Sequence, residues 1–245
     1  MVHRPEVAPH FYARPAKSRA SGGRFRPASH PARIAQVFTQ GPLAGNRTME
    51  RIKPKDMALI QRLLSLDKPY FSPADLEKAL GQKRPALYVT LNRLVKYGVL
   101  ARLGQGVYQV TLRTADLPRI ANQLVYPSYL SFESALSRCG ILSQAPYVLT
   151  FATSRRSRRL ILEEHSVEFR QLKEELFFGY TLQGGLYVAE PEKALLDQFY
   201  MVSRGLSSLT PEELDLSPLN LERLQLYASH FPPAAQAAVK RAFPR

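Results

Sequence analysis

The chain has 245 residues and a formal net charge of +14, with 45% hydrophobic residues and no tryptophan. This composition provides enough apolar material for one small and one medium domain with real cores. A single cysteine, Cys139, excludes an internal disulfide and is typical of the reducing cytosol. No apolar run approaches ~18 residues and no apolar leader is present, so we expect a cytoplasmic protein without a membrane partner.

Residues 1–50 are predicted to be a disordered basic tail. They hold eight basic residues against two acidic ones, six prolines and little apolar periodicity, so they cannot bury enough surface to fold. Three interpretations stay open. The segment is a dispensable tail or the product of a start codon placed too far upstream, with Met49 as the natural start; it is an arm that adds nonspecific DNA affinity; or it is an organellar presequence, which the prolines disfavour.

Residues 51–110 are predicted to form a winged helix-turn-helix. Apolar residues recur at helical spacing over 56–66, and Ser72 followed by Pro73 marks the start of a second helix. A third helix over 84–97 buries its leucines and ends at Gly98, which tolerates a left-handed backbone. Two short apolar runs, 99–103 and 107–110, flank Gly-Gln-Gly and predict the ribbon of the wing.

The outer face of the third helix has the chemistry of a DNA-reading surface. Amides pair with adenine, guanidiniums with guanine, methyl groups contact thymine, and lysines neutralise phosphates. The DNA-binding candidates on this helix and the wing are Lys83, Arg84, Val89, Asn92, Arg93, Lys96, Arg102 and Gln105. The alternative is a winged helix that binds protein, its basic face merely solvated.

The distribution of charge supports a polyanionic partner for one end of the chain only. Residues 1–50 carry a net charge of +6, residues 51–110 carry +7, and residues 111–245 carry +1. Double-stranded DNA is therefore the expected partner of the winged helix, whereas the remainder has another task.

The fold class expected is α+β, with the N-terminal winged helix-turn-helix followed by a mixed α/β second domain. Residues 111–125 are predicted to be a linker with a short helix, and residues 126–245 the second domain. Strands are expected over 147–153 and 167–172, and a hairpin over 178–182 and 186–189. Ser131 is the expected cap of one helix, and Pro191 opens another.

Four arginines gather in the second domain and form a second basic patch. We expect this patch either to extend the DNA-binding surface or to bind an acidic toxin or a nucleic acid. The alternative is that the arginines lie on a solvated loop or strand edge. They are Arg155, Arg156, Arg158 and Arg159.

No catalytic residue is predicted. Cys139 lies at helical spacing among apolar residues, so we expect it in the core. Glu190, Glu192 and Lys193 invite comparison with nuclease carboxylates, but acidic residues at a helix start are explained by the helix dipole. The five histidines lack ligand spacing, which predicts neither metal nor cofactor.

A series of ordered motifs carries a family resemblance over about residues 57–205. A winged helix is followed by YPSYLSFESALSRCGIL, VLTFATSRRSRR, VEFRQLKEELFFGY and EPEKALLD. In this order the chain resembles the AbiEi-type antitoxins of type IV toxin–antitoxin systems. The long basic N-terminus departs from the family pattern, and the helices beyond Leu206 carry no matching motif.

The resemblance implies a bacterial or archaeal cytosolic repressor that binds inverted repeats upstream of its own operon. It also implies that the second domain counteracts a nucleotidyltransferase-like toxin, with or without a stable complex. Two other classes stay open: a ligand-responsive winged-helix transcriptional regulator without a toxin partner, which needs a pocket in the second domain, and a DNA-binding nuclease, which needs a carboxylate cluster.

Overall fold

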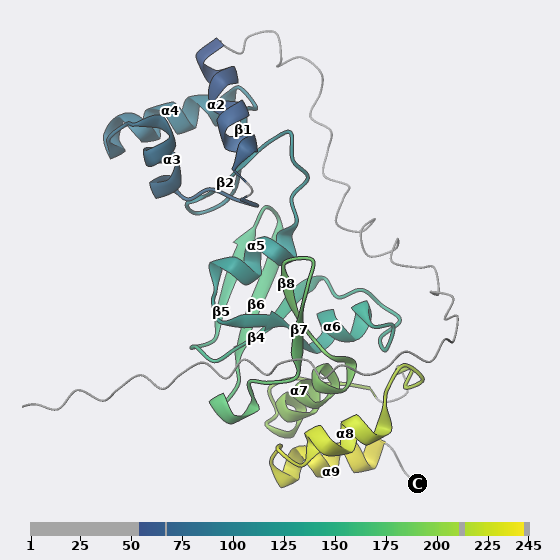
Figure 1. Cartoon of the computed structure of the whole chain (residues 1–245). Coiled ribbons are helices and arrows are strands. Elements are labelled where there is room, and N and C mark those ends of the chain that lie inside the picture. Colours follow the sequence, from purple (N-terminus) through teal and green to yellow (C-terminus); the bar gives the residue numbers. More distant parts are fainter. Residues whose placement is uncertain (1–53, 67, 211–213, 243–245) are drawn as a thin grey trace, which may run out of the picture.

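The computed structural model in Figure 1 describes residues 54–66, 68–210 and 214–242. The basic tail predicted over residues 1–50 lies outside these ranges. Among the helices that are described, none is both long enough and apolar enough to cross a membrane.

The winged helix folds in the predicted order. Three helices precede a two-stranded antiparallel ribbon: α2 (Pro54–Ser65), α3 (Pro73–Leu80), α4 (Arg84–Lys96), β1 (Leu100–Gly104) and β2 (Val107–Val110). One buried core joins them, with Leu63 from α2, Leu76 from α3 and Leu91 from α4 fully enclosed. The apolar periodicity therefore identified the core-facing side of α3 and α4. In α2 the periodicity also placed Met57 in the buried stripe, but Met57 is 42% exposed, and Leu59 is buried instead.

Short-range signals set the helix ends of this domain. The Ser72 hydroxyl accepts the Asp75 N–H at 3.2 Å, and the Asp75 carboxylate accepts the Ser72 N–H at 2.9 Å, a reciprocal capping box. Gly81 after α3 and Gly98 after α4 have φ of 64° and 66°, where a side chain would be strained. The prediction that Gly98 ends the third helix is confirmed.

The second domain is built on a six-stranded mixed sheet, and the α+β prediction is confirmed. The strand order is β5-β6-β4-β3-β8-β7; β4 pairs with β6, and β3 with β8, in parallel, and the other pairs are antiparallel. The strands are β3 (Ser128–Leu130), β4 (Val148–Thr153), β5 (Arg158–Leu162), β6 (His165–Gln171), β7 (Tyr180–Gln183) and β8 (Leu186–Ala189).

Helices cover both faces of this sheet (Figure 1). On one face lies α5 (Leu117–Leu124). The other face carries α6 (Phe132–Arg138), α7 (Pro191–Ser203), α8 (Leu221–Ala228) and α9 (Pro233–Ala242), and a short 3-10 turn, η2 (Glu174–Leu176), follows β6. Each face encloses its own apolar core, so the sheet separates two cores.

Helix α5 belongs to the second domain, although its residues fall in the segment predicted as a linker. Leu117, Ile120 and Ala121 are buried against the sheet, and the Asn122 amide donates to the Ser128 carbonyl at 2.7 Å. A helix with one fully buried face is part of a core rather than a connection. We therefore place the start of the second domain at α5 and not at Tyr126.

The tip of the wing is packed on the second domain. Leu103 and Val107 are buried in the core beneath α5, together with Leu162 of β5. The main chain continues this contact, because the Glu163 N–H donates to the Leu103 carbonyl. The winged helix and the sheet are joined by packed side chains as well as by the connecting chain.

Gly104 is the closest point of this contact and provides a test of it. A Cβ atom there would lie 3.0 Å from the Ile161 carbonyl oxygen and 3.2 Å from Leu162 Cδ2. We expect Gly104→Val to cost about 1–3 kcal/mol by overpacking, because a main-chain oxygen cannot easily move aside. Thermal unfolding measures the cost, with Gln105→Val at the exposed neighbouring position as control. Melting at the same temperature as the parent would contradict the docked wing.

Several elements of the second domain were not predicted. Strand β5 begins with exposed arginines, β3 has three residues, and α9 follows directly on Pro232. Ser131 does occupy the N-cap of α6, but its side chain makes no capping hydrogen bond. Its hydroxyl instead donates to Asp197 at 2.8 Å.

Asp197 is the centre of a buried polar network between the sheet and α7. It accepts hydrogen bonds from Lys193, from the Tyr129 hydroxyl at 3.0 Å and from Ser131. Lys193 also donates to the Tyr129 oxygen at 2.8 Å. Burial raises the pKa of Asp197 and lowers the pKa of Lys193, so both charges depend on these partners.

Aromatic rings complete the enclosure of this lysine. The Lys193 ammonium lies 5.2 to 5.3 Å from the ring centres of Tyr129, Phe178 and Phe231. At this separation the faces of the rings attract a cation. The EPEKALLD motif thus supplies the internal ion pair that fixes α7 on the sheet.

Candidate nucleic-acid interface

The outer face of α4 is an exposed surface without an acidic side chain. Leu87, Leu91 and Leu94 fix the inward side of the helix in the core. On the opposite side Val89 is 71% exposed and Asn92 is exposed one turn further along. The structure thus presents the apolar and amide groups that the helical wheel placed on this side.

Basic side chains lie at both ends of this face. Lys83 and Arg84 are exposed at the N-terminal end and Lys96 at the C-terminal end. Among the described residues, Glu77 is the one acidic side chain within ion-pair range of these three cations, and it lies 4.0 Å from Arg84 Nε. Pairs as exposed as this one contribute little, so all three cations are available to a polyanion.

Tyr88 belongs to the same face, and the sequence analysis did not name it. Its side chain is 45% exposed, one turn after Arg84 and one turn before Asn92. The spacing of four residues was the available signal, because residues at i and i+4 share one face of a helix.

Arg93 is placed differently from the other candidates. Its guanidinium donates two hydrogen bonds to the Asp56 carboxylate, at 3.0 and 3.1 Å, and ties α4 to α2. The Asp56 side chain is 6% exposed, so breaking this pair would leave a buried carboxylate alone. In this structure Arg93 is a partly exposed support of α4 whose guanidinium is turned toward α2.

This placement of Arg93 predicts a loss of stability on substitution. We expect Arg93→Ala to cost about 1–3 kcal/mol of unfolding free energy, because Asp56 loses its partner. The paired change Arg93→Ala with Asp56→Ala should recover part of that loss, since no buried charge then remains. Urea unfolding measures both. Unchanged stability of Arg93→Ala, together with weaker DNA binding, would instead assign the side chain to direct reading of bases.

The wing presents its two predicted residues from a docked ribbon. The side chains of Arg102 and Gln105 are exposed. However, Gly104 at the end of β1 lies against Ile161 of β5, and in the turn that follows a Cβ on Gly106 would stand 3.7 Å from Pro73 Cδ. Arg102 and Gln105 therefore extend from a fixed surface that the winged helix shares with the second domain.

The comparison with known families concerns this same segment. Residues 59–111 match the family described as Transcriptional regulator, AbiEi antitoxin. The winged helix is therefore similar to that of the AbiEi antitoxins. The resemblance to these antitoxins is confirmed over a segment that begins within α2 and ends just after β2, and includes the whole of α4. A search of curated proteins gave no match.

The four arginines predicted as a second basic patch do not all lie on one face of the sheet. Arg155 and Arg156 lie in the loop before β5 and are exposed. In the β5–β6 ladder Arg158 is opposite Phe169 and Arg159 opposite Glu168, and cross-strand partners share a face of the sheet. Arg158 and Arg159 therefore leave the strand on opposite faces.

Glu168 already engages one of these arginines. It accepts hydrogen bonds from Arg159 and, on its other oxygen, from Arg170 at 3.3 Å. Burial would raise the pKa of Glu168, but the two guanidiniums outweigh burial and hold the pKa below its usual value. Arg155, Arg156 and Arg158 are the members of the cluster without an ion pair among the described residues.

The carboxylates at the start of α7 have structural partners. Glu190 accepts the Tyr227 hydroxyl at 2.5 Å, and Glu192 accepts the Asn220 N–H at 2.7 Å. Arg223 lies 3.8 Å from Glu190 and 3.7 Å from Glu192. Burial and the Glu190 hydrogen bond raise the pKa of Tyr227 to about 12. Both glutamates thus join α7 to α8.

Lys193 and Cys139 also serve the core. Lys193 is buried beside Asp197 and does not converge with Glu190 and Glu192. Cys139 packs at the edge of the same core, where burial raises the pKa of its thiol. Within the described ranges no three histidine, cysteine or acidic side chains are grouped so as to hold a metal ion.

Proposed function

We propose that this protein is the antitoxin of a type IV toxin–antitoxin system that represses its own operon and counteracts a nucleotidyltransferase-like toxin. The observation that carries the repressor half is the exposed, acid-free face of α4 inside the segment that matches the AbiEi antitoxin family. The toxin half rests on the family resemblance. Both activities belong in the bacterial cytoplasm and require no membrane.

In this proposal α4 enters the major groove of an inverted-repeat operator. The Asn92 amide pairs with an adenine edge, and Val89 contacts a thymine methyl group. Lys83 and Arg84 at one end, and Lys96 at the other, contact phosphates and fix the register of the helix. Arg93 supports α4 through Asp56 and acts on DNA only by holding the helix in position.

The contact between the wing and β5 favours a DNA footprint that continues onto the second domain. Arg158 lies four residues before Leu162, the β5 residue that packs against the wing. At about 3.3 Å per residue, the arginine cluster therefore begins about 13 Å along the strand from that contact. In this proposal Arg155 and Arg156 neutralise phosphates of a duplex that runs past the wing. Arg159, held by Glu168, is not needed for this role.

Toxin neutralisation is assigned to the domain from α5 onward. Its near-neutral charge leaves it less suited than the winged helix to bind nucleic acid, and the motifs after the wing are those of the antitoxin resemblance.

Co-expression of the neighbouring gene product with the full chain tests the proposal. We expect the full chain to rescue growth and to repress a reporter driven by its own upstream region. The variant Lys83→Gln with Lys96→Gln should release the reporter and still rescue growth, and Lys240→Gln on α9 is the control for removal of a positive charge outside α4. A neighbouring gene without toxicity, in an unrelated metabolic operon, would contradict the antitoxin assignment and favour a plain transcriptional regulator.

A further inference from the structure

Arg93 lies next to Asn92 on α4, and its guanidinium is engaged by Asp56 of α2. Nη1 donates to one carboxylate oxygen at 3.0 Å, and Nη2 donates to the other at 3.1 Å. The Asp56 side chain is 6% exposed, whereas the Arg93 side chain is 27% exposed. The arginine therefore lies at the border of the exposed face of α4, while its acidic partner is enclosed beneath the helix.

This ion pair uses the part of Arg93 that would recognise guanine. Arginine binds guanine through two parallel N–H donors, which contact the O6 and N7 acceptors in the major groove. The two terminal nitrogens of Arg93 already hold the two oxygens of a carboxylate. A buried carboxylate is costly to leave without its counter-ion, so guanine has to compete with Asp56 for the same side chain.

The side chains that remain in the middle of the face favour A·T pairs. Val89 offers exposed methyl groups and Asn92 an exposed amide. In the major groove these groups match the thymine methyl and the adenine edge. The other cations, Lys83, Arg84 and Lys96, lie at the two ends of the face, where the proposed function assigns them to phosphates.

We propose that Asp56 determines the base preference of α4 by holding Arg93 away from guanine, so that the helix selects an A·T-rich sequence in each half of the operator. Asp56 is a positioning residue that acts through Arg93 and does not contact DNA itself. The inference rests on the operator binding proposed above. Loss of the carboxylate should free the guanidinium and shift the selected sequence toward guanine.

Selection of duplexes from a pool with randomised half-sites, followed by sequencing, tests this role with the full chain. The parent should select A·T pairs opposite the middle of α4. Asp56→Asn keeps the side-chain volume and removes the charge, and Asp56→Ala removes the acceptor as well. In both variants we expect guanine to be enriched about 5-fold or more over the parent at one position of each half-site, because Arg93 then forms its bidentate contact.

A second substitution distinguishes the release of Arg93 from a structural effect of losing Asp56. Asp56→Ala with Arg93→Ala lacks the guanidinium, so it should return to the A·T preference of the parent. A purely structural role of Asp56 would weaken binding to all sequences and would not add guanine. Thermal melts verify that each variant is folded at the temperature of the selection.

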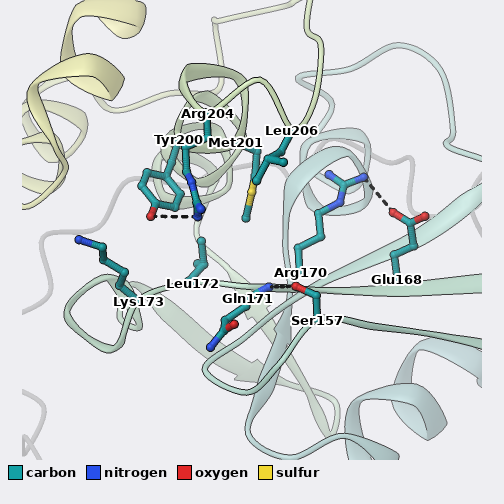
Figure 2. A pocket seen from close by; sticks show the side chains of 10 residues that line it. All are labelled: Ser157, Glu168, Arg170, Gln171, Leu172, Lys173, Tyr200, Met201, Arg204 and Leu206. Atoms are coloured by element: carbon teal, nitrogen blue, oxygen red, sulfur yellow. Dashed lines mark hydrogen bonds and ion pairs between the residues drawn. The ribbon is translucent and has the colours of Figure 1, made fainter.

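Glu168→Gln is the matched control for removing a carboxylate from an arginine outside α4. Figure 2 shows Glu168 beside Arg170, with 3.3 Å between Glu168 Oε2 and Arg170 Nη2. Both residues belong to β6 of the second domain. This variant changes the net charge by the same amount as Asp56→Asn, and it should leave the base preference of the parent unchanged.

The outcomes separate this inference from the proposed function. A base preference that is unchanged in both Asp56→Asn and Asp56→Ala would overturn the inference and leave operator binding by α4 in place. Guanine selected by the parent and lost in Arg93→Ala would also overturn it, because Arg93 would then bind guanine despite Asp56. A parent that selects no sequence would overturn operator binding and this inference together.

Discussion

Asp197→Ala is expected to destabilise the second domain by about 3–5 kcal/mol, because it leaves the buried Lys193 ammonium without its counter-ion. Both side chains are fully buried, so water cannot replace the missing carboxylate. The hydroxyls of Tyr129 and Ser131 lose their acceptor in the same step. Urea unfolding followed by circular dichroism measures the change, with Glu222→Ala on the exposed side of α8 as a control near zero.

Removing both charges distinguishes the contribution of the ion pair to stability from the contribution of side-chain packing. Lys193→Met combined with Asp197→Leu fills a similar volume and leaves no buried charge. We expect this double variant to be more stable than Asp197→Ala, because the unpaired ammonium is the largest cost. An Asp197→Ala protein that unfolds at the urea concentration of the parent would show that the pair does not hold α7 on the sheet.

Asn92→Ala is expected to have the largest effect on sequence preference for DNA. Loss of a bidentate contact to adenine costs about 1–3 kcal/mol, or about 5-fold to 150-fold in affinity for the preferred sequence. Binding to unrelated duplexes should change little, because phosphate contacts carry nonspecific affinity. Competition gel shifts with the upstream region of the operon and a scrambled duplex measure both.

The control for Asn92 is Gln225→Ala, an exposed amide on α8 outside the proposed interface. It should retain the affinity and the preference of the parent. Equal discrimination by Asn92→Ala and the parent would remove this side chain from base recognition and leave α4 with phosphate contacts alone.

The features predicted from sequence are those that local spacing determines. The leucines of α4 recur every three or four residues, and Ser72 followed by Pro73 marks the start of α3, so neighbouring residues were sufficient to place both. The β7–β8 hairpin was recognised from Gly184 and Gly185 for the same reason, since each glycine has a positive φ. The winged helix and the hairpin can therefore be predicted without tertiary information.

The features missed depend on contacts between distant parts of the chain. Arg93 looked like an outward cation on a helical wheel, but Asp56, 37 residues earlier, draws it to α2. A helical wheel shows on which face of a helix a residue lies, but it does not show which distant residue a long side chain contacts in the folded protein. Arg159 was grouped with its sequence neighbours, whereas the register of β5 on β6 brings it to Glu168.

The buried lysine was beyond sequence reasoning for a related reason. Lys193 and Asp197 are four residues apart on α7, which suggests a surface pair. Tyr129 and Ser131, more than 60 residues earlier, close over them and make the pair internal.

The dependence of DNA affinity on salt tests most directly the central claim that α4 binds operator DNA. Fluorescence anisotropy with the upstream region of the operon gives the slope of log affinity against log salt for the parent, Lys83→Gln with Lys96→Gln, and Lys240→Gln. Removing one phosphate-binding lysine should reduce the slope by about 0.9, so the double variant should show a slope smaller by about 1.8 and bind more weakly to every sequence. Lys240→Gln should match the parent. A double variant with the affinity and slope of the parent would contradict the assignment of α4 as the DNA-binding element.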